Sequence, residues 1–176
     1  MNCRNLVDIN LGDISLDEIG QRAFSRTGLK NLKTKLLVYD KTSTEIFSNC
    51  WNLKDVQITS NVLFEKMFDG CSNCSALDII YSNTRNKSET IYNENISATY
   101  EDIPNDIPII GSIPFSGCRS VSTLKMSGFS DFSLKNVLYG LETVSSVILD
   151  DDAEYSIENL CFDENPKLSS FIFGRN

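Results

Sequence analysis

Cysteine is the residue type in this chain that could most directly carry chemistry. Two of the six cysteines, Cys71 and Cys74, are separated by two residues, and thiolates at this spacing can bind zinc or exchange disulfides. A structural zinc site needs a second pair of ligands, however, and the sequence has no second pair of this kind and no histidine. We therefore expect neither a metal site nor a redox site at these cysteines.

The absence of histidine also limits enzymatic chemistry, because it removes the usual general base and every Ser/His or Cys/His nucleophilic pair. Paired carboxylates occur at Asp17 and Glu18 and in the run 150–152. They fall in expected connections, whereas general acid–base catalysis requires a desolvated cleft. The acidic run is best interpreted as a solvated turn, since a calcium site would need further oxygen ligands at loop spacing. We predict a protein that is not an enzyme, with no catalytic residues, cofactor or metal.

Composition excludes further functional classes. The net charge of −8 argues against a nucleic-acid partner, because binding phosphates requires a basic surface. No segment reaches the roughly 20 apolar residues that span a bilayer, so we expect no membrane insertion. The glycosylation acceptor sequences at Asn73, Asn86 and Asn95 are about as many as chance gives in a chain rich in Asn, Ser and Thr, and carry little weight.

A repeated pattern positions the cysteines. It reads aromatic, two residues, Cys, two residues, Leu, two residues, aliphatic, one residue, aliphatic, and it recurs at intervals of about 23 residues. A period of this length predicts a solenoid, in which each copy forms one coil and stacks on its neighbours. The clearest copies cover 47–58, 68–79 and 115–126, further copies cover 24–32, 138–149 and 162–173, and residues 3–11 match the second half of the motif.

The repeat predicts where the cysteines lie. Four of them share the Cys position and Cys74 occupies the neighbouring Leu position, so we expect these five to be buried as small apolar residues. A disulfide between Cys50 and Cys71 is within reach of stacked coils, but parallel side-chain directions disfavour its torsion. Cys161 lies off the pattern and is expected to be exposed. The four cysteines at the Cys position are Cys3, Cys50, Cys71 and Cys118.

The repeat resembles the BspA-type leucine-rich repeat of surface proteins from bacteria and parasitic protists. Ile19, Gly20, Ala23 and Phe24 match the opening of that family's unit, although the common Leu-Pro after the strand is missing. The resemblance implies an α/β repeat solenoid that is mostly β. It would be a curved superhelix with one short parallel strand per coil on the concave face and turns or short helical segments on the convex face. It also implies adhesion or protein binding, with no catalytic centre.

The repeat frame covers essentially the whole chain. We predict a single leucine-rich-repeat domain over residues 1–176, with about eight coils. Between the copies at Phe68 and Phe115 the frame allows one degenerate copy, but the segment is polar and contains two of the four prolines. A distorted coil or a loop is therefore expected at 82–108.

The frame also predicts a binding face. Because side chains alternate along a strand, the residue between the last two aliphatic positions faces outward. The resulting row is polar for most of its length and turns apolar towards the C-terminus, and small serines beside it would leave the sheet open to a partner. The alternative is an ordinary exposed strand surface with isolated isoleucines. The candidate face comprises Gln57, Asp78, Lys125, Ser145, Ile148, Ser169 and Ile172.

These features favour a non-enzymatic protein-interaction module in cell-surface adhesion or in binding to a host or other partner. The alternative is an intracellular structural or scaffolding repeat protein in the cytoplasm, which the reduced-looking cysteines and the lack of an apolar secretory segment at the start of the chain favour. Both ends fall inside the repeat pattern. This predicts end-to-end self-association or continuation in a longer protein. Nothing in the sequence selects a particular protein partner.

Overall fold

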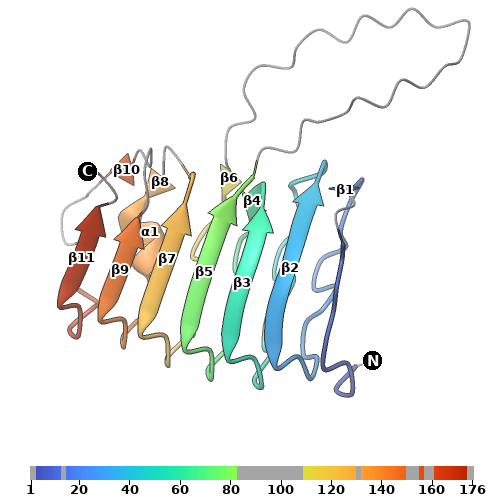
Figure 1. Cartoon of the computed structure of the whole chain (residues 1–176), viewed down its shortest axis with the longest axis horizontal. Coiled ribbons are helices and arrows are strands. Elements are labelled where there is room, and N and C mark those ends of the chain that lie inside the picture. Colours follow the sequence, from blue (N-terminus) through green and yellow to red (C-terminus); the bar gives the residue numbers. More distant parts are fainter. Residues whose placement is uncertain are drawn as a thin grey trace, which may run out of the picture.

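The computed structural model describes residues 3–12, 15–82, 109–129, 132–149, 155–156 and 161–173. In these residues successive coils stack along one axis to form a parallel β solenoid, with the strands of the main sheet lying side by side (Figure 1). Almost no helix is present. The predicted repeat solenoid, mostly β with one short parallel strand per coil, is confirmed.

The main sheet has seven parallel strands in the order β1-β2-β3-β5-β7-β9-β11. Each strand follows from the repeat, because the apolar residues at alternate positions face the core and the intervening residues face outward. In β3, for example, Val56 and Ile58 are buried whereas Asp55 and Gln57 are exposed. The strands are β1 (Ser15–Leu16), β2 (Asn31–Val38), β3 (Asp55–Ser60), β5 (Ala76–Tyr81), β7 (Thr123–Ser127), β9 (Ser146–Leu149) and β11 (Ser170–Phe173).

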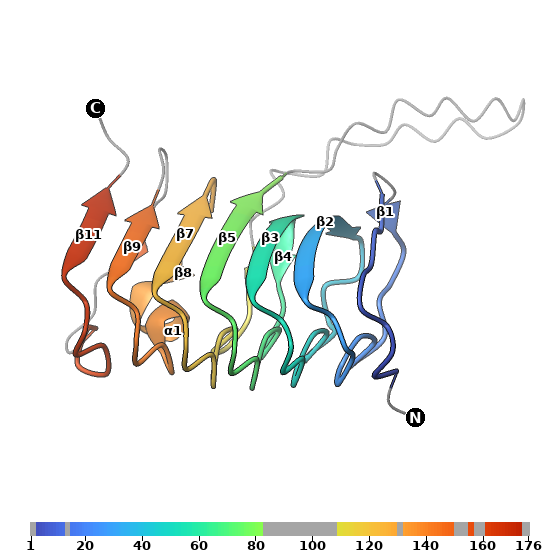
Figure 2. The ribbon, with the colours of Figure 1, turned by 60° about the horizontal axis from the view of Figure 1, so that its bottom comes forward.

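Turns, short strand pairs and one helical turn form the side of the solenoid opposite the main sheet. Two small parallel sheets pair β4 (Val62–Leu63) with β6 (Ile109–Ile110), and β8 (Phe132–Ser133) with β10 (Tyr155–Ser156). The helix α1 (Leu134–Leu138) lies behind β7 and β9 (Figure 2). The structure thus has the turns and short helical segment that the family resemblance implied for this side.

The aromatic position of the motif builds a stack through the core. Phe24, Phe47, Phe68 and Phe115 follow one another with ring centroids 5.4, 5.5 and 6.1 Å apart and interplanar angles of 20° or less. Offset stacking at such separations stabilises aromatic pairs beyond the effect of burial alone. The stack therefore ties four successive coils together between the sheet and the turns.

The strands on either side of the long polar segment pair directly with each other. Ala76 in β5 lies opposite Thr123 in β7, and the register continues to Ile80 opposite Ser127. The sheet consequently has no strand between β5 and β7. The degenerate coil or loop predicted for 82–108 lies, apart from residue 82, outside the described residues.

The cysteine predictions hold for four residues and are wrong for two. Cys50, Cys71, Cys74 and Cys118 are fully buried, as the repeat predicted. Cys3, in contrast, is exposed, because it lies in the first described coil and has a neighbouring coil on one side only. Cys161 is buried although it lies off the pattern. In its coil the next residue, Phe162, points outward and is 37% exposed, so the two positions have exchanged their expected environments.

Candidate protein-binding face

The cross-strand register places five of the predicted residues in one row on the exposed face of the main sheet. Gln57 lies beside Asp78, Asp78 beside Lys125, Lys125 beside Ile148, and Ile148 beside Ile172. Neighbouring strands of a sheet are about 4.8 Å apart, so the row is a continuous line of side chains. We call these five residues the central row.

The central row is polar at β3, β5 and β7. Gln57 Nε2 donates a hydrogen bond of 3.3 Å to Asp78 Oδ2. The other carboxylate oxygen, Asp78 Oδ1, is buried and has no hydrogen-bond partner among the described residues. A buried polar atom without a partner lowers stability, so a small rotation of the carboxylate that exposes this oxygen would let it gain the missing hydrogen bond.

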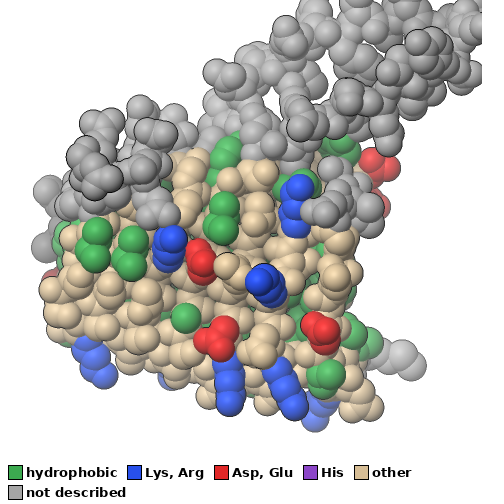
Figure 3. All heavy atoms as spheres, in the orientation of Figure 1, with side chains coloured by type: hydrophobic (Ala, Val, Ile, Leu, Met, Phe, Trp, Pro, Cys, Tyr) green, Lys and Arg blue, Asp and Glu red, His purple; other side chains and the backbone are tan. Residues whose placement is uncertain are grey.

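The central row becomes apolar at β9 and β11. Ile148 is half-buried and Ile172 is 47% exposed, and they are direct cross-strand neighbours. Figure 3 shows two hydrophobic side chains next to each other at this end of the face, with charged side chains beside them and further hydrophobic side chains over the middle of the sheet. Ile148 and Ile172 therefore form a small apolar patch at the end of the central row.

The two predicted serines have a structural role that the sequence did not indicate. Ser145 Oγ donates to Ser122 O at 3.1 Å, and Ser169 Oγ donates to Ser145 O at 3.2 Å. Ser122 and Ser75 make the same bond to the coils before them. These hydroxyls therefore join successive coils at the start of each strand, and they are not available as free donors for a partner. All four serines directly follow the Leu position of the motif, and this shared position was the signal that could have revealed the ladder of hydrogen bonds.

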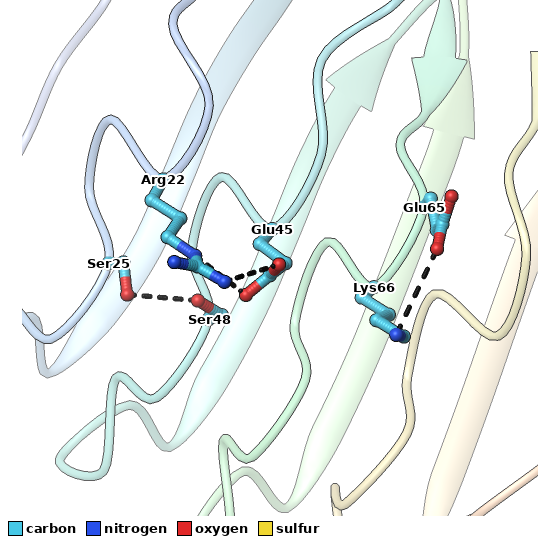
Figure 4. A network of polar contacts seen from close by, with 6 residues as sticks. All are labelled: Arg22, Ser25, Glu45, Ser48, Glu65 and Lys66. Atoms are coloured by element: carbon cyan, nitrogen blue, oxygen red, sulfur yellow. Dashed lines mark hydrogen bonds and ion pairs between the residues drawn. The ribbon is translucent and has the colours of Figure 1, made fainter.

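On the opposite side, polar side chains join the turns of successive coils (Figure 4). Arg22 donates from Nε and Nη2 to the two carboxylate oxygens of Glu45, each at 2.9 Å, and Ser48 Oγ donates to Ser25 Oγ at 2.9 Å. The hydrogen bonds from Arg22 lower the pKa of Glu45 below its usual value. Lys66 Nζ lies 3.9 Å from Glu65 Oε1. The Arg22–Glu45 and Ser48–Ser25 contacts thus join neighbouring coils, whereas the Lys66–Glu65 pair lies within one turn.

Comparison with protein families identifies the repeat. The family model of the BspA type leucine rich repeat region matches residues 1–100 and 88–176, with 6 copies of the repeat. The chain belongs to the BspA-type leucine-rich repeat family. No curated protein and no solved structure matches it. Repeats of this BspA-type family are typically non-enzymatic modules that mediate interactions between proteins, and none of the described helices is long and apolar enough to cross a membrane.

The thiols of this BspA-type solenoid occupy buried positions. Burial raises the pKa of Cys74 to about 12 and holds that of Cys118 well above the usual value. The hydrogen bond with Cys71 lowers the pKa of Cys50 to about 7, and the same contact, together with burial, raises that of Cys71. Because the Cys50 sulfur is fully buried, its acidity does not make it an accessible nucleophile. Within the described part of the chain, no group of three or more His, Cys, Asp or Glu residues could hold a metal ion.

Proposed function

We propose that this solenoid is a non-enzymatic protein-binding module whose partner docks on the central row, centred on Ile148 and Ile172. The observation that supports this proposal is the direct pairing of the two isoleucines at the end of a central row that is otherwise polar. Burying apolar surface against a partner is worth roughly 25 cal/mol per Å², and interfaces are usually anchored by a small, central apolar cluster. Because the patch is small, the polar residues of the central row must also contribute to the free energy of binding.

The polar part of the central row would orient the partner. Asp78 Oδ1 is buried and lacks a hydrogen-bond partner, and after a small rotation of the carboxylate it would accept a hydrogen bond from a backbone amide or a polar side chain of the bound protein. The exposed side chain of Gln57, on the neighbouring strand, donates to Asp78 Oδ2 and orients the carboxylate. Polar contacts of this kind add specificity more than affinity. The partner therefore presents apolar side chains to β9 and β11 and a hydrogen-bond donor to β5.

A pull-down with matched variants tests the proposed face. The double variant Ile148→Thr, Ile172→Thr keeps β-branched side chains in both strands while removing the apolar contact. The matched control is Tyr139→Thr, because Tyr139 is 43% exposed but lies at the end of α1, away from the sheet face. We expect the double variant to lose at least about 90% of the recovered partner, corresponding to about 1.4 kcal/mol or more. Equal losses in the double variant and the control would argue against this face.

A second substitution tests the polar contribution. Asp78→Asn keeps one oxygen acceptor and the side-chain shape, whereas Asp78→Ala removes the acceptor. If the partner donates a hydrogen bond here, Asp78→Ala weakens binding by about 1 to 3 kcal/mol more than Asp78→Asn does. Identical affinities in calorimetry would show that Asp78 lies outside the interface.

The cellular setting of the module is adhesion or partner binding at the cell surface, by analogy with the BspA-type family. The alternative is an intracellular scaffold, which the buried free thiols of Cys50, Cys71, Cys74 and Cys118 favour. Labelling intact cells with an antibody or with a membrane-impermeant biotin reagent distinguishes them. Labelling without permeabilisation supports the surface role, whereas labelling only after permeabilisation supports the scaffold.

Self-association is a second candidate, and the position of β11 at the end of the described sheet favours it. Among the described residues β11 is the last strand in the order of the main sheet, next to β9. Phe162, next to this edge, packs edge-on against Phe171 and is partly exposed. Light scattering across a concentration series tests this contact. A mass that rises with concentration and falls in Phe162→Lys, but not in Tyr139→Lys, would support a second copy at this edge.

A further inference from the structure

Asn73 lies in the turn that leads into β5. The turns that precede the strands line the edge of the sheet where the strands begin (Figure 1). The Asn73 side chain is exposed. Asn73, Cys74 and Ser75 form an acceptor sequence for N-linked glycosylation. Of the acceptor sequences in the chain, this is the one that falls within the described residues. Its structural surroundings can therefore be tested against the chemistry of the modification.

The Asn73 side chain already has a structural role. Its Nδ2 donates a hydrogen bond of 2.6 Å to the backbone oxygen of Trp51 on the neighbouring coil. Ser120 and Thr143 hold the same motif position on later coils, and their hydroxyls also donate to the preceding coil, at 2.7 and 2.8 Å. A modification of Asn73 must preserve this coil-to-coil bond if the solenoid is to fold normally.

N-linked glycosylation does preserve it. A carboxamide nitrogen carries two hydrogens, and the contact with Trp51 uses one of them. In the glycosylated side chain one hydrogen is replaced by the sugar and the other remains, so a secondary amide can still donate to the Trp51 oxygen. Because Asn73 is exposed, the sugar can extend into solvent from the turn. Glycosylation is therefore compatible with both the hydrogen bonding and the burial at this position.

We propose that Asn73 is an N-glycosylation site, which accepts an oligosaccharide when the chain enters a secretory pathway. The donor is a lipid-diphosphate-linked oligosaccharide. Asn73 Nδ2 forms a bond to the anomeric carbon of the first sugar and releases one proton, while the bond from that carbon to the diphosphate oxygen breaks and the lipid diphosphate leaves. No oxidant or reductant is required.

The fold also determines when the modification can take place. The acceptor sequence requires the Ser75 hydroxyl, but in the folded solenoid Ser75 Oγ lies 3.1 Å from Lys54 O and 3.1 Å from Asp55 Oδ1. The intervening Cys74 is fully buried. An enzyme therefore cannot engage the acceptor sequence in an extended form once the coils have stacked. Glycosylation of Asn73 precedes folding of this coil, and the purified folded protein is not a substrate.

Glycosylation would also restrict the binding face. Asp78 in the central row follows Asn73 by five positions, so at most about 17 Å of extended chain separates them. A glycan at the strand-start edge would hinder a partner from approaching over that edge and leave the middle of the strands accessible. Glycosylation of Asn73 goes beyond the proposed binding function and does not depend on it, because the modified residue lies at the edge of the sheet and outside the central row.

Peptide mapping of the full chain tests the proposal. The chain is secreted from glycosylating eukaryotic cells behind a heterologous signal, and the secreted and retained pools are digested and analysed by mass spectrometry. We expect the peptide containing Asn73 to carry a glycan that a peptide N-glycosidase removes. Asn86 and Asn95 fall at other positions and are scored as separate sites. Ser75→Ala keeps Asn73 and should abolish its modification, and the folded wild-type protein should not be modified in vitro.

Asn52 provides a matched control. It is exposed and holds the same motif position on the preceding coil, but Lys54 stands where an acceptor sequence needs Ser or Thr. Asn52 should be unmodified in the wild type and modified in Lys54→Thr. An unmodified Asn73 in a chain whose Asn52 is glycosylated in Lys54→Thr would overturn the proposal, because the cells would then be competent and the neighbouring turn accessible. The readout is a peptide mass, so a failure of the binding proposal would not affect it.

Discussion

The thiol of Cys71 donates a hydrogen bond to the backbone oxygen of Phe47, 3.2 Å away on the neighbouring coil. Cys50 makes the same bond to Phe24 O and Cys118 makes it to Phe68 O, each also at 3.2 Å. The Cys position of the motif thus supplies a small apolar group and a donor for a buried carbonyl of the preceding coil. This double role explains why a cysteine suits the position better than a purely apolar residue does.

Replacing Cys71 should separate the two contributions. Cys71→Ala removes a fully buried sulfur and its hydrogen bond, so we expect a loss of about 2 to 3 kcal/mol in the free energy of unfolding. Cys71→Ser keeps a donor of smaller size and should lose less. Urea unfolding followed by circular dichroism, with a reducing agent present, measures both. The exposed thiol of Cys3 supplies the control, and a Cys71→Ala loss no larger than that of Cys3→Ala would contradict a role for the buried hydrogen bond.

Buried thiols should also make the solenoid sensitive to alkaline pH. Burial raises the pKa of Cys74 to about 12 in the folded state, whereas the pKa of a cysteine in an unfolded chain is about 8.5. Above about pH 8.5 the unfolded chain releases this proton and the folded chain keeps it. The stabilisation from the neutral thiol is therefore complete below about pH 8.5 and decreases by up to about 1.4 kcal/mol for each further pH unit.

The variant Cys74→Ala tests this dependence, although it lowers stability at every pH. Between about pH 8.5 and 10.5, the wild type should lose about 1.4 kcal/mol more of its free energy of unfolding per pH unit than Cys74→Ala does. Lysines and tyrosines titrate in the same range, so the difference between variants is the informative quantity. Cys3→Ala again controls for the loss of a cysteine as such. Parallel pH profiles for the wild type and Cys74→Ala would contradict the assignment.

The aromatic position of the motif should matter most where its side chain is buried in the stack. Phe68 is fully buried and stacks on Phe47 and Phe115, with centroid distances of 5.5 and 6.1 Å. We expect Phe68→Ala to cost about 3 to 5 kcal/mol. Phe162 holds the same motif position but is partly exposed, so Phe162→Ala should cost less than half as much. Thermal and urea unfolding measure the two variants under the same conditions, and equal losses would contradict a stabilising role of burial in the stack.

The repeat frame was sufficient to predict the architecture because the period fixes both which residues face the core and which residues become neighbours across strands. Lys125, Ile148 and Ile172 share one position of the frame, and the cross-strand register brings them together. The same argument predicted burial of Cys50 and Cys118. These predictions depend only on spacing, which stacked coils preserve.

The frame could not predict features that depend on individual hydrogen bonds or on the ends of the stack. The expectation that Ser145 and Ser169 leave the face open considered their size and not their donors, which bind carbonyls of the preceding coil. The prediction for Cys3 was wrong because a position in the frame implies burial only where coils lie on both sides. The prediction for Cys161 was wrong because Cys161 and the next residue, Phe162, exchange their expected environments. Nor did the frame indicate that β5 and β7 pair directly, since spacing alone allows a further copy between them.

A glycine at the turn beside the aromatic position provides a last prediction about stacking. Gly117 has a φ of +72°, and a Cβ at this position would lie 2.9 Å from the backbone nitrogen of Gly70 on the neighbouring coil. Gly117→Ala therefore combines left-handed backbone strain with a backbone clash, and it should destabilise the protein by more than about 1 to 2 kcal/mol. Gly20 is the matched control, because a Cβ there meets no atom within 4 Å and its φ is not positive. Gly20→Ala should change stability by no more than about 0.5 kcal/mol. Equal stability of the two variants in urea unfolding would show that the coils can separate at this turn without cost, which would contradict close backbone packing between Gly70 and Gly117.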